Sequence, residues 1–402
     1  MPVQKTPALT PIIRNAALFA AATRTHNMTN MLTGPAPKGI AEIGKMQTDA
    51  GAPIVRVTDL TTQPGQQVTV DIVHRLTGRP TMGDERLEGR SDTMTFAQDT
   101  VGINQGRHLV DNGGAMFVQT IGQPINQIAQ ALLKSWYKDL DEETTLYHLA
   151  GARGSDYNSN LIVPLEADPE YAKIMVNPVV PPTFSRHFYG GDATSVQNID
   201  SSDLMSLTTI DNLSLYLQEM ASPIKHVALA GDEAADENPF YILFVTPRQW
   251  RDLQNQSSTA DFNKLVASAM NRSKGFKHPL FTGDYLMKDK IMVRRMNRRI
   301  RFNAGSQVRV SENNANATTT LQTASVNIER AFLLGSQALA YAHGRTKTAN
   351  SHFSIREDEK DNGNIKEYTI AYCNGKKALQ FRDRDGVLHD HGRIIVDTAV
   401  GN

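Results

Sequence analysis

The sequence is poor in the residues that build disulfide-stapled, metal-bound or membrane-spanning proteins. It has one cysteine, Cys373, among 402 residues, which excludes an intrachain disulfide framework and a cysteine-rich zinc module. A lone cysteine of this kind is typical of a small packed residue in a protein that folds in a reducing compartment. The apolar runs all fall short of the ~20 residues that a membrane-crossing helix needs. We therefore expect no membrane partner.

Net charge is also absent. The chain carries 42 basic and 42 acidic residues, which gives a formal net charge of zero. A neutral chain exerts no general attraction on nucleic acid or on anionic membranes, and it supplies little repulsion between copies of itself. At 402 residues the chain exceeds the size at which one hydrophobic core usually stops growing, so we expect two or more lobes.

Catalytic signatures are missing as well. The sequence contains no nucleophile elbow, HExxH zinc motif or dinucleotide-binding glycine fingerprint. The pair with metal-ligand character is His389 and His391, whose imidazoles would share one face of a strand. No third ligand or supporting shell is evident, and a solvated turn after Asp385 and Gly386 is the plainer interpretation. A metal-dependent hydrolase built on these histidines stays an alternative, and no cofactor is predicted.

What the sequence does have, within residues 76–108, is a turn-rich and densely charged segment (78–90) that lies between two strand-like runs. Val68, Val70 and Ile72 alternate with polar residues before it, and Met94 and Phe96 begin a second alternating run after it. Alternation with a period of two on both sides of a Gly/Pro-rich segment predicts a β-hairpin. The connection is far longer than a plain hairpin needs, and long loops in compact proteins are usually functional.

The tip of this hairpin carries both signs of charge in equal number. A surface of mixed sign suits docking against another protein surface better than it suits phosphate, which favours one sign. We therefore predict that the tip forms an inter-subunit contact through Arg79, Asp84, Glu85, Arg86, Glu88 and Arg90.

The densest positive segment runs from Arg294 to Arg301. On a continuous strand, Arg295, Arg299 and Arg301 would share one face, and the other arginines would share the opposite face. Three interpretations stay open. The segment binds the phosphates of a nucleic acid, or it pairs with acidic tip residues of another copy, or it is a solvated strand face. For the second interpretation, Arg295 and Arg299 are the candidate inter-subunit contacts.

The remaining elements mix helices and strands, which predicts an α+β fold. Residues 121–150 hold apolar residues at spacings of three and four, the pattern of a long amphipathic helix. Residues 152–205 are irregular and rich in proline, a second helix is expected at 210–220, and helical periodicity covers 326–341. Strands are expected at 240–245, 291–302, 307–310, 368–372 and 393–396, with a turn at Asn374 and Gly375 between the last two.

Three segments resemble the major capsid proteins of short-tailed double-stranded DNA phages. The first is LTGRPTMGDERLEG at 76–89 with its return VGINQGRHLVDNGG at 101–114. The others are ERAFLLGSQA at 329–338 and HGRIIVDTA at 391–399. The most similar group comprises podoviruses that package a virion RNA polymerase. The resemblance extends from about residue 60 to the C-terminus, and it implies an HK97-like phage capsid fold.

The resemblance implies a structural, non-enzymatic protein that self-assembles into hexamers and pentamers of an icosahedral head enclosing double-stranded DNA. It implies an N-terminal arm (1–60), an extended hairpin loop (61–112), a peripheral domain with the spine helix (113–204), an axial domain (205–345) and a return to the peripheral domain (346–402). The implied partners are other copies, a portal, a decoration protein and non-specifically bound DNA at the inner surface. The implied location is the virion shell, assembled in the cytoplasm of the bacterial host.

Overall fold

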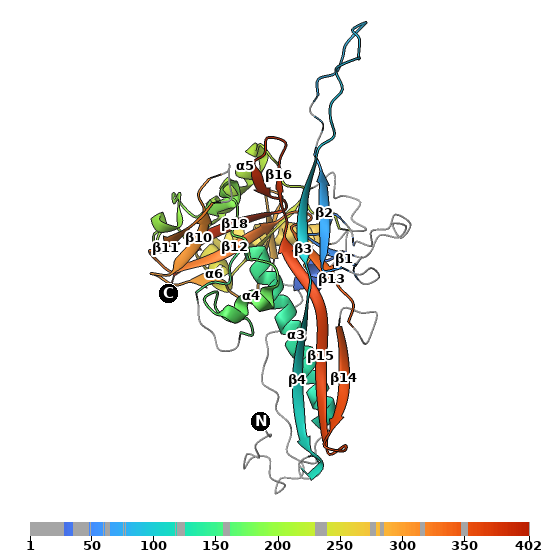
Figure 1. Cartoon of the computed structure of the whole chain (residues 1–402). Helices are drawn as coiled ribbons and strands as arrows, with labels where there is room; N and C mark the ends of the chain where they lie inside the picture. The colour runs from blue at the N-terminus through green and yellow to red at the C-terminus, as the bar shows by residue number, and fades with distance from the viewer. Residues whose placement is uncertain are drawn as a thin grey trace.

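The computed structural model describes residues 28–34, 48, 50–58, 60, 65–74, 76, 78–116, 118, 125–155, 161–229, 239–273, 279–281, 285–313, 318–346 and 353–401. These residues form a body of strands and helices, a long arm built on one helix, and a thin hairpin that projects from the other end (Figure 1). Helices and strands are interspersed along the chain, so the predicted α+β class is confirmed.

The body is organised around a sheet with the strand order β5-β18-β12-β6-β8-β7, and β9 lies beside β12. Two of its inner strands, β12 (Ile328–Leu334) and β18 (Arg393–Ala399), are buried at every residue, as expected for strands covered on both faces. The predicted strand at 240–245 is confirmed as β6 (Tyr241–Val245). The sheet is completed by β5 (His187–Tyr189), β7 (Tyr285–Lys288), β8 (Ile291–Arg295) and β9 (Arg301–Phe302).

Helices pack on both faces of this sheet. On one face, α5 (Leu207–Glu219) and α6 (Pro247–Gln256) bury apolar side chains such as Leu213 and Trp250 against it. On the other face lies the C-terminal part of α3 (Ile125–Ala150), whose Leu146 and Leu149 join a core with Phe332. The predicted helices at 121–150 and 210–220 are thus confirmed over their described parts. A further helix, α7 (Thr259–Ser273), follows α6.

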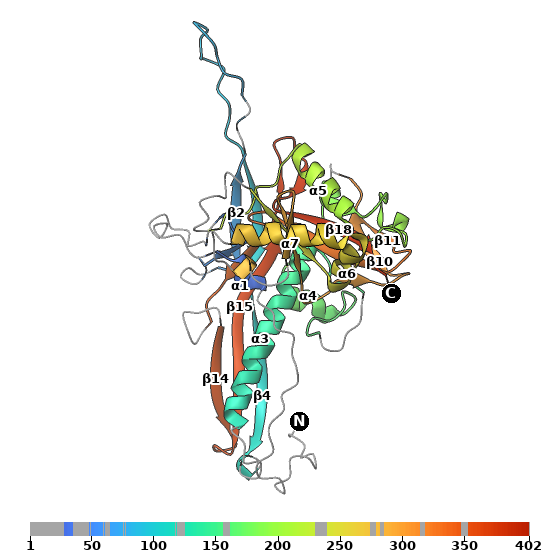
Figure 2. The same cartoon turned by 180° about the vertical axis from the view of Figure 1, so that it is seen from behind.

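The arm consists of α3 lying along a second sheet (Figures 1 and 2). Ala129 and Leu133 of α3 pack on Tyr368 and Ile370 of that sheet, so an apolar stripe holds a helix that is otherwise half exposed. The longest strand, β15 (Ile365–Ala378), pairs with β4 (Asn104–Gly114), β14 (Phe353–Lys360) and β13 (Leu339–His343), and β1 (Ile54–Val57) lies parallel to β13.

Two fully buried arginines join the arm to the body. Arg330 of β12 donates a hydrogen bond to the carbonyl oxygen of Ala150 at 3.3 Å. Arg393 of β18 donates to the carbonyl oxygens of His148 at 2.6 Å and Leu149 at 3.3 Å. The last carbonyls of a helix lack partners within the helix and carry partial negative charge. The two guanidinium groups therefore satisfy the C-terminal end of α3 inside the protein.

The other elements are short. The prediction of an irregular segment at 152–205 is confirmed over its described part, which holds only α4 (Pro169–Met175), β5 and two single turns of 3-10 helix. The strand expected at 307–310 is confirmed as β10 (Gln307–Ser311), which pairs with β11 (Thr319–Thr323). β16 (Gln380–Arg382) pairs with β17 (Leu388–Asp390). Of the expected N-terminal arm, residues 1–27 and 35–47 lie outside the described residues, and α1 (Met28–Leu32) lies within them. No helix in the described ranges combines the length and apolar character needed to cross a bilayer.

The helix expected over 326–341 is wrong, because this segment forms strands β12 and β13. Glu329 and Arg330 appear in the sequence as the polar side of an amphipathic helix. In the structure both side chains are fully buried, and they are paired: Glu329 accepts a hydrogen bond from Thr246, and Arg330 binds Asp397. A strand buried on both faces loses the alternation by which strands are recognised.

Two further expectations need correction. Asn374 and Gly375 do not form a turn, because both lie within the long strand β15. The strand expected over 291–302 is interrupted after Arg295 and resumes only at Arg301. Between them Met296 and Ile300 are buried and the backbone is not a strand, so the alternation expected of a continuous strand does not apply. Arg295 and Arg299 are nevertheless exposed, whereas Arg294, Arg298 and Arg301 are half-buried.

Candidate inter-subunit surface

The hairpin of β2 (Gln67–Val73) and β3 (Phe96–Gly102) is confirmed as predicted. Its strands are antiparallel, with Gln67 opposite Gly102 and Val73 opposite Phe96. Side chains alternate between a half-buried face and an exposed face along both strands. The half-buried face, with Val68, Val70, Ile72 and Ala97, packs on a small apolar cluster formed by Val101, Ala340, Ala342, Leu379 and Phe381. The hairpin root is therefore attached to the body through one face only.

Polar contacts fix the root of the hairpin in place. Asp99 accepts hydrogen bonds from Lys377 Nζ and from the backbone N–H of Gln380, the latter at 3.2 Å. The side-chain amide of Asn177 bonds both the N–H and the carbonyl oxygen of Gly102, each at 2.9 Å. Sequence analysis missed Asp99 and Asn177. Nothing in their spacing marks an isolated polar residue as a contact between segments far apart in the chain.

A glycine lets the hairpin root lie directly on β15. A Cβ atom at Gly375 would stand 1.9 Å from the carbonyl oxygen of Gly102, so no side chain fits between the two backbones. Glycine inside a strand often marks such a close approach of another backbone. Asn374 and Gly375 have the composition of a turn, but here the glycine allows two backbones to pack closely.

Beyond the root, the hairpin tip (residues 78–91) stands clear of the body (Figure 1). Gly83 and Gly89 adopt positive φ values of 62° and 80°, which makes the chain bend tightly at two places along the tip. At the base of the tip, Asp92 accepts a hydrogen bond from the backbone N–H of Gly78 and pairs with Arg384, each at 2.8 Å. The tip is thus tied at its base and bare along its length.

All six charged residues predicted for the contact occupy exposed positions: Arg79, Asp84, Glu85, Arg86, Glu88 and Arg90. The structure brings two of them together, because Arg90 pairs with Glu85. Both side chains of that pair are more than half exposed, at 53% and 58%. An exposed ion pair is worth at most about 1 kcal/mol, so a partner can displace it at low cost.

The hairpin also carries apolar side chains that the charge analysis overlooked. Of thirteen large hydrophobic residues exposed in the described part of the chain, six lie on this hairpin: Val73, Leu76, Met82, Leu87, Met94 and Phe96. Leu87 and Met82 are 71% and 70% exposed. Val73 and Phe96 stand opposite each other on the outer face. Such a concentration of exposed apolar side chains is typical of the surfaces by which proteins bind partners. The sequence does contain a sign of this exposure. Met94 and Phe96 are at even-numbered positions and Val101 is at an odd one, so on a strand they face away from the side that buries Val101.

The arginine segment at 294–301 splits into inward and outward members. Arg298 pairs with Glu143 and, at 3.4 Å, with Asp139, and it therefore belongs to the interior of the body. Arg295 and Arg299, the two candidate contacts, lie at exposed positions on either side of it.

His389 and His391 are each engaged by different protein groups. The ring of His389 lies 2.9 Å from Ser185 Oγ and 3.1 Å from Asp383 Oδ2, whereas His391 Nε2 lies 3.0 Å from Gln337 Oε1. Burial lowers the pKa of both imidazoles, that of His391 to about 4. Within the described ranges, no three histidine, cysteine, aspartate or glutamate side chains gather in a way that could hold a metal.

The profile of a family described as "Phage capsid protein" matches residues 8–402. The chain belongs to this phage capsid protein family. The named relatives are capsid proteins, and none of them supports the hydrolase or nucleic-acid-binding alternatives.

The relatives agree with the predicted HK97-like fold. The capsid protein is 22% identical to the major capsid protein of Pseudomonas phage KPP25 over 260 residues, which are 61% of this chain and 64% of that protein. The match therefore spans less than two thirds of this curated relative. The fold is similar to the capsid of Ralstonia phage GP4, with a TM-score of 0.76 and 24% identity over 100% of this chain and 99% of that one. It is also similar to the Cyanophage Pam1 capsid, with a TM-score of 0.59 and 15% identity over 97% and 100%.

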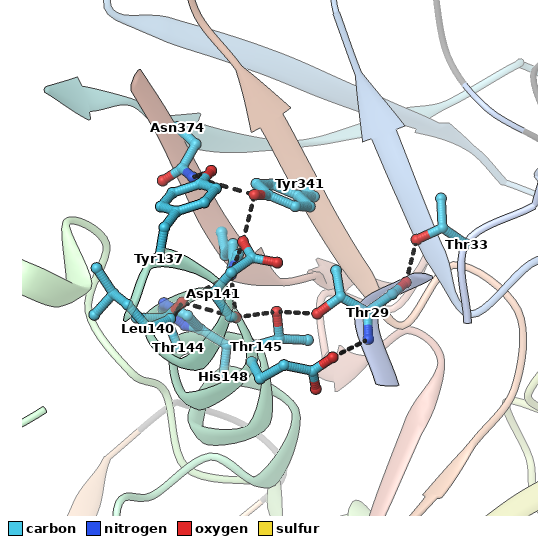
Figure 3. A network of polar contacts seen from close by, with 12 residues as sticks. Thr29, Thr33, Tyr137, Leu140, Asp141, Thr144, Thr145, His148, Tyr341 and Asn374 are labelled. Atoms are coloured by element: carbon cyan, nitrogen blue, oxygen red, sulfur yellow. Dashed lines mark hydrogen bonds and ion pairs between the residues drawn. The ribbon is translucent and has the colours of Figure 1, made fainter. Parts of the chain in front are cut away.

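A partly buried polar network holds the helix α3 in position (Figure 3). Asp141 accepts a hydrogen bond from the Tyr341 hydroxyl at 2.5 Å and lies 2.8 Å from Lys376 Nζ. Asn374 donates to the hydroxyls of Tyr341 and Tyr137 at 3.1 and 3.2 Å. Burial alone would raise the pKa of Asp141, but Lys376 and the Tyr341 hydroxyl outweigh it and lower the pKa. The network therefore holds the half-buried Asp141 carboxylate in its charged form.

The short helix α1 docks on the same part of α3 (Figure 3). The backbone N–H of Thr29 donates to Glu142 Oε1 at 3.3 Å, and the Thr29 and Thr145 hydroxyls lie 3.1 Å apart. Burial, with a smaller contribution from the nearby Asp141, raises the pKa of Glu142 to about 7 against the opposing effect of the Thr29 N–H. Glu142 therefore titrates near neutral pH.

Proposed function

We propose that this chain is the shell-forming subunit of a phage head, and that its copies assemble into hexamers and pentamers of an icosahedral capsid around double-stranded DNA. The observation that carries the proposal is the β2–β3 hairpin, which projects from the body (Figure 1). It carries exposed apolar side chains and charges of both signs. Exposed apolar surface is stabilising only once it is buried against a partner. A second copy supplies such a partner at every position of a closed shell.

In this proposal each copy lays its hairpin tip over a neighbour. The apolar residues Met82 and Leu87 supply the buried centre of the contact, and the charged residues around them supply specificity. A standard protein interface buries about 1,600 Å². Repeating such modest contacts around a closed shell gives large collective stability by multivalency, while each single contact stays weak enough to be corrected.

The acidic tip residues have matching cations on the body. We assign Glu85 and Glu88 of one copy to ion pairs with the exposed Arg295 and Arg299 of another, because arginine binds carboxylates through two parallel hydrogen bonds. The second candidate partner for these arginines is the phosphate backbone of packaged DNA at the inner surface, which would be non-specific.

The parts of the chain receive the following roles in this proposal. Residues 1–60 form the N-terminal arm and residues 61–112 form the extended loop. Within this loop the β2–β3 pair ends at Gly102, and the next strand, β4, already belongs to the sheet that lies along α3. Residues 113–204 and 346–402 form the peripheral domain around α3, and 205–345 form the axial domain that meets other copies around the capsomer axes.

The wider setting is also part of the proposal. The three sequence segments that resemble podovirus capsid proteins support a short-tailed phage of the group that packages a virion RNA polymerase. A portal and a decoration protein are then further partners, and assembly takes place in the cytoplasm of the bacterial host. The single cysteine is compatible with that reducing compartment.

Electron microscopy of two purified full-length proteins tests the proposal. The wild-type chain is expected to form shells, sheets or tubes when its concentration is raised. A variant in which a short glycine-serine turn replaces residues 79–91 keeps the hairpin root and is expected to stay a small species with an unchanged circular dichroism spectrum. Assembly of the variant to the wild-type level contradicts the role of the tip. A wild-type protein that stays a small species under all conditions contradicts the shell function itself.

A further inference from the structure

The sheet that lies along α3 has two edge strands, β14 and β4 (Figure 1). Each of them pairs with β15 and with no other strand in the described part of the chain. An edge strand presents unpaired backbone N–H and C=O groups, so another strand can pair with it. Proteins usually protect such edges with charged residues, proline or an irregular backbone.

The edge at β14 is protected and the edge at β4 is open. Five of the eight residues of β14 are charged, and its Glu357 and Glu359 both pair with Lys366 of β15. Among the eleven residues of β4, only Arg107 and Asp111 carry a formal charge, and none is proline. The pairing of β4 with β15 is regular over residues 104–111, and its one register shift lies beyond them. The strand β4 therefore offers a long, regular edge.

The two faces of β4 differ in what their side chains contact. His108 stacks on Trp136 of α3, with 4.2 Å between the ring centres, and Val110 packs on an apolar cluster under the same helix. Even-numbered positions of this strand therefore face α3, and odd-numbered positions face away from it. The outward face carries an exposed cation, a 47% exposed apolar side chain and a half-buried anion, in that order: Arg107, Leu109 and Asp111.

This outward pattern is complementary to itself. In an antiparallel pair of two β4 strands with Leu109 opposite Leu109 of the second copy, each Arg107 stands opposite an Asp111. One Asp111 oxygen accepts a hydrogen bond from the Gly113 N–H at 2.8 Å, but a carboxylate accepts several, so it stays available to a cation. A shift of the register by two residues removes both ion pairs. The charges therefore select one alignment, which also places both α3 helices on the same face of the joined sheet.

We propose that β4 is a contact between two copies of this chain across a two-fold axis, in which the strands pair antiparallel about Leu109 and join their sheets. A contact of this symmetry closes on itself, because the same residues serve both copies. The surface is separate from the hairpin tip, and the pair needs only two chains. Repetition of the contact in a shell rests on the proposed function, but formation of the pair does not.

Disulfide cross-linking of the full-length chain tests the register. All variants carry Cys373→Ser, which removes the natural thiol. Opposite residues of antiparallel strands have Cα atoms about 4.5–5.5 Å apart, within the range that a disulfide allows. Leu109→Cys is therefore expected to give a covalent dimer on a non-reducing gel after mild oxidation. The matched control, Gln105→Cys, is exposed on the same face but stands far from its own copy, and it is expected to stay monomeric.

Charge reversal tests the pairing itself. In the Leu109→Cys background, Arg107→Asp leaves two acidic strands facing each other, and Asp111→Arg leaves two basic strands. Each variant alone is expected to cross-link about tenfold more slowly, because like charges then stand directly opposite each other. A mixture of the two variants is expected to recover the original rate as a heterodimer, since an acidic strand then faces a basic one. Circular dichroism verifies that each variant is folded.

Three outcomes would each overturn the proposal: no covalent dimer from Leu109→Cys, equal cross-linking of Gln105→Cys, or no recovery in the mixture. If Asp111→Arg does not fold, the two cysteine variants and Arg107→Asp still decide. Shells that form without the Leu109→Cys cross-link overturn this contact alone. A cross-linked pair in a chain that forms no shells overturns the shell function alone.

Discussion

Arg330 and Asp397 face each other in register across strands β12 and β18, and they form a completely buried ion pair. The guanidinium donates from Nε to Oδ1 at 2.7 Å and from the terminal nitrogen to Oδ2 at 2.6 Å. His187 adds a third contact, with Nε2 at 2.7 Å from Oδ2. Burial alone would raise the pKa of Asp397, but Arg330 and His187 outweigh it and hold the pKa well below its usual range.

Replacing this arginine is expected to be severely destabilising. Arg330→Met leaves the Asp397 carboxylate buried without its cation and frees the carbonyl of Ala150, so the free energy of unfolding should fall by about 3–5 kcal/mol. Denaturant unfolding at fixed protein concentration measures the loss. The control Arg384→Met removes an exposed partner of Asp92 and should cost less than about 1 kcal/mol. If the free energy of unfolding fell equally in the two variants, the prediction that the buried ion pair matters more than an exposed one would be contradicted.

Glu142 is expected to make the protein less stable as the pH rises through neutrality. Its pKa is raised from 4.5 to about 7 in the folded state, so between these values the folded protein holds a proton that the unfolded chain releases. The stability from this group is therefore complete below pH 4.5 and is lost as the pH rises through 7. Glu142→Gln keeps an oxygen for the Thr29 N–H and removes the titration. Relative to wild type, the variant should gain about 1–3 kcal/mol between pH 5 and pH 8.

Unfolding curves at the two pH values provide the measurement for Glu142. The control Glu170→Gln makes the same change at an exposed position in the first turn of α4. A constant difference between wild type and Glu142→Gln across this pH range would contradict the prediction.

His391 is expected to contribute to instability in acid. Burial lowers its pKa from 6.5 to about 4, so in that interval the unfolded chain binds a proton that the folded protein excludes. The stability from a neutral His391 is present above pH 6.5 and is lost as the pH falls towards 4. His391→Gln should flatten the decline of stability between these values by about 1–3 kcal/mol, as measured by unfolding at each pH. His74→Gln, at the base of the hairpin, is the control, and an unchanged slope in His391→Gln would refute the assignment.

A charge swap tests the proposed pairing of the tip with the arginines of another copy. Glu85→Arg with Glu88→Arg should leave the subunit folded and reduce particle yield at least tenfold, because the tip then repels Arg295 and Arg299. Adding Arg295→Glu and Arg299→Glu to the same chain should restore much of the yield, as counted by electron microscopy and sedimentation. The matched control, Glu170→Arg with Glu312→Arg, reverses exposed charges on the body. Loss without rescue would assign the arginines to another partner, such as DNA phosphate.

The sequence was most informative where periodicity is clean. Alternation in β2 and β3, the amphipathic stripe of α3 and the apolar run of β6 each predicted the element that the structure contains. The prediction was wrong at β12, where a helix was expected. Glu329 and Arg330 are charged, yet they are buried in a strand that is covered on both faces. No pattern within that segment reveals that Thr246 and Asp397, far away in the chain, neutralise the cost of burying them.

The candidate site divides in the same way. The charged tip is local, so composition and turn residues were enough to predict it. The attachment of the hairpin root is not local, because its contacts join three separate segments of the chain. Asn177 donates to the carbonyl oxygens of Gly102 and Lys376, and Lys377 donates to Asp99. Spacing along the sequence carries no trace of such contacts, because isolated asparagine and aspartate residues occur throughout any surface.

The absence of a side chain at Gly375 has a consequence for the whole hairpin. The backbone of the hairpin root rests directly on the backbone of β15 there, so this contact fixes the angle at which the hairpin leaves the body. A methyl group at position 375 would push Gly102 away, and the resulting displacement would grow with distance along the hairpin. The position of the tip in space therefore depends on a glycine in the middle of a strand.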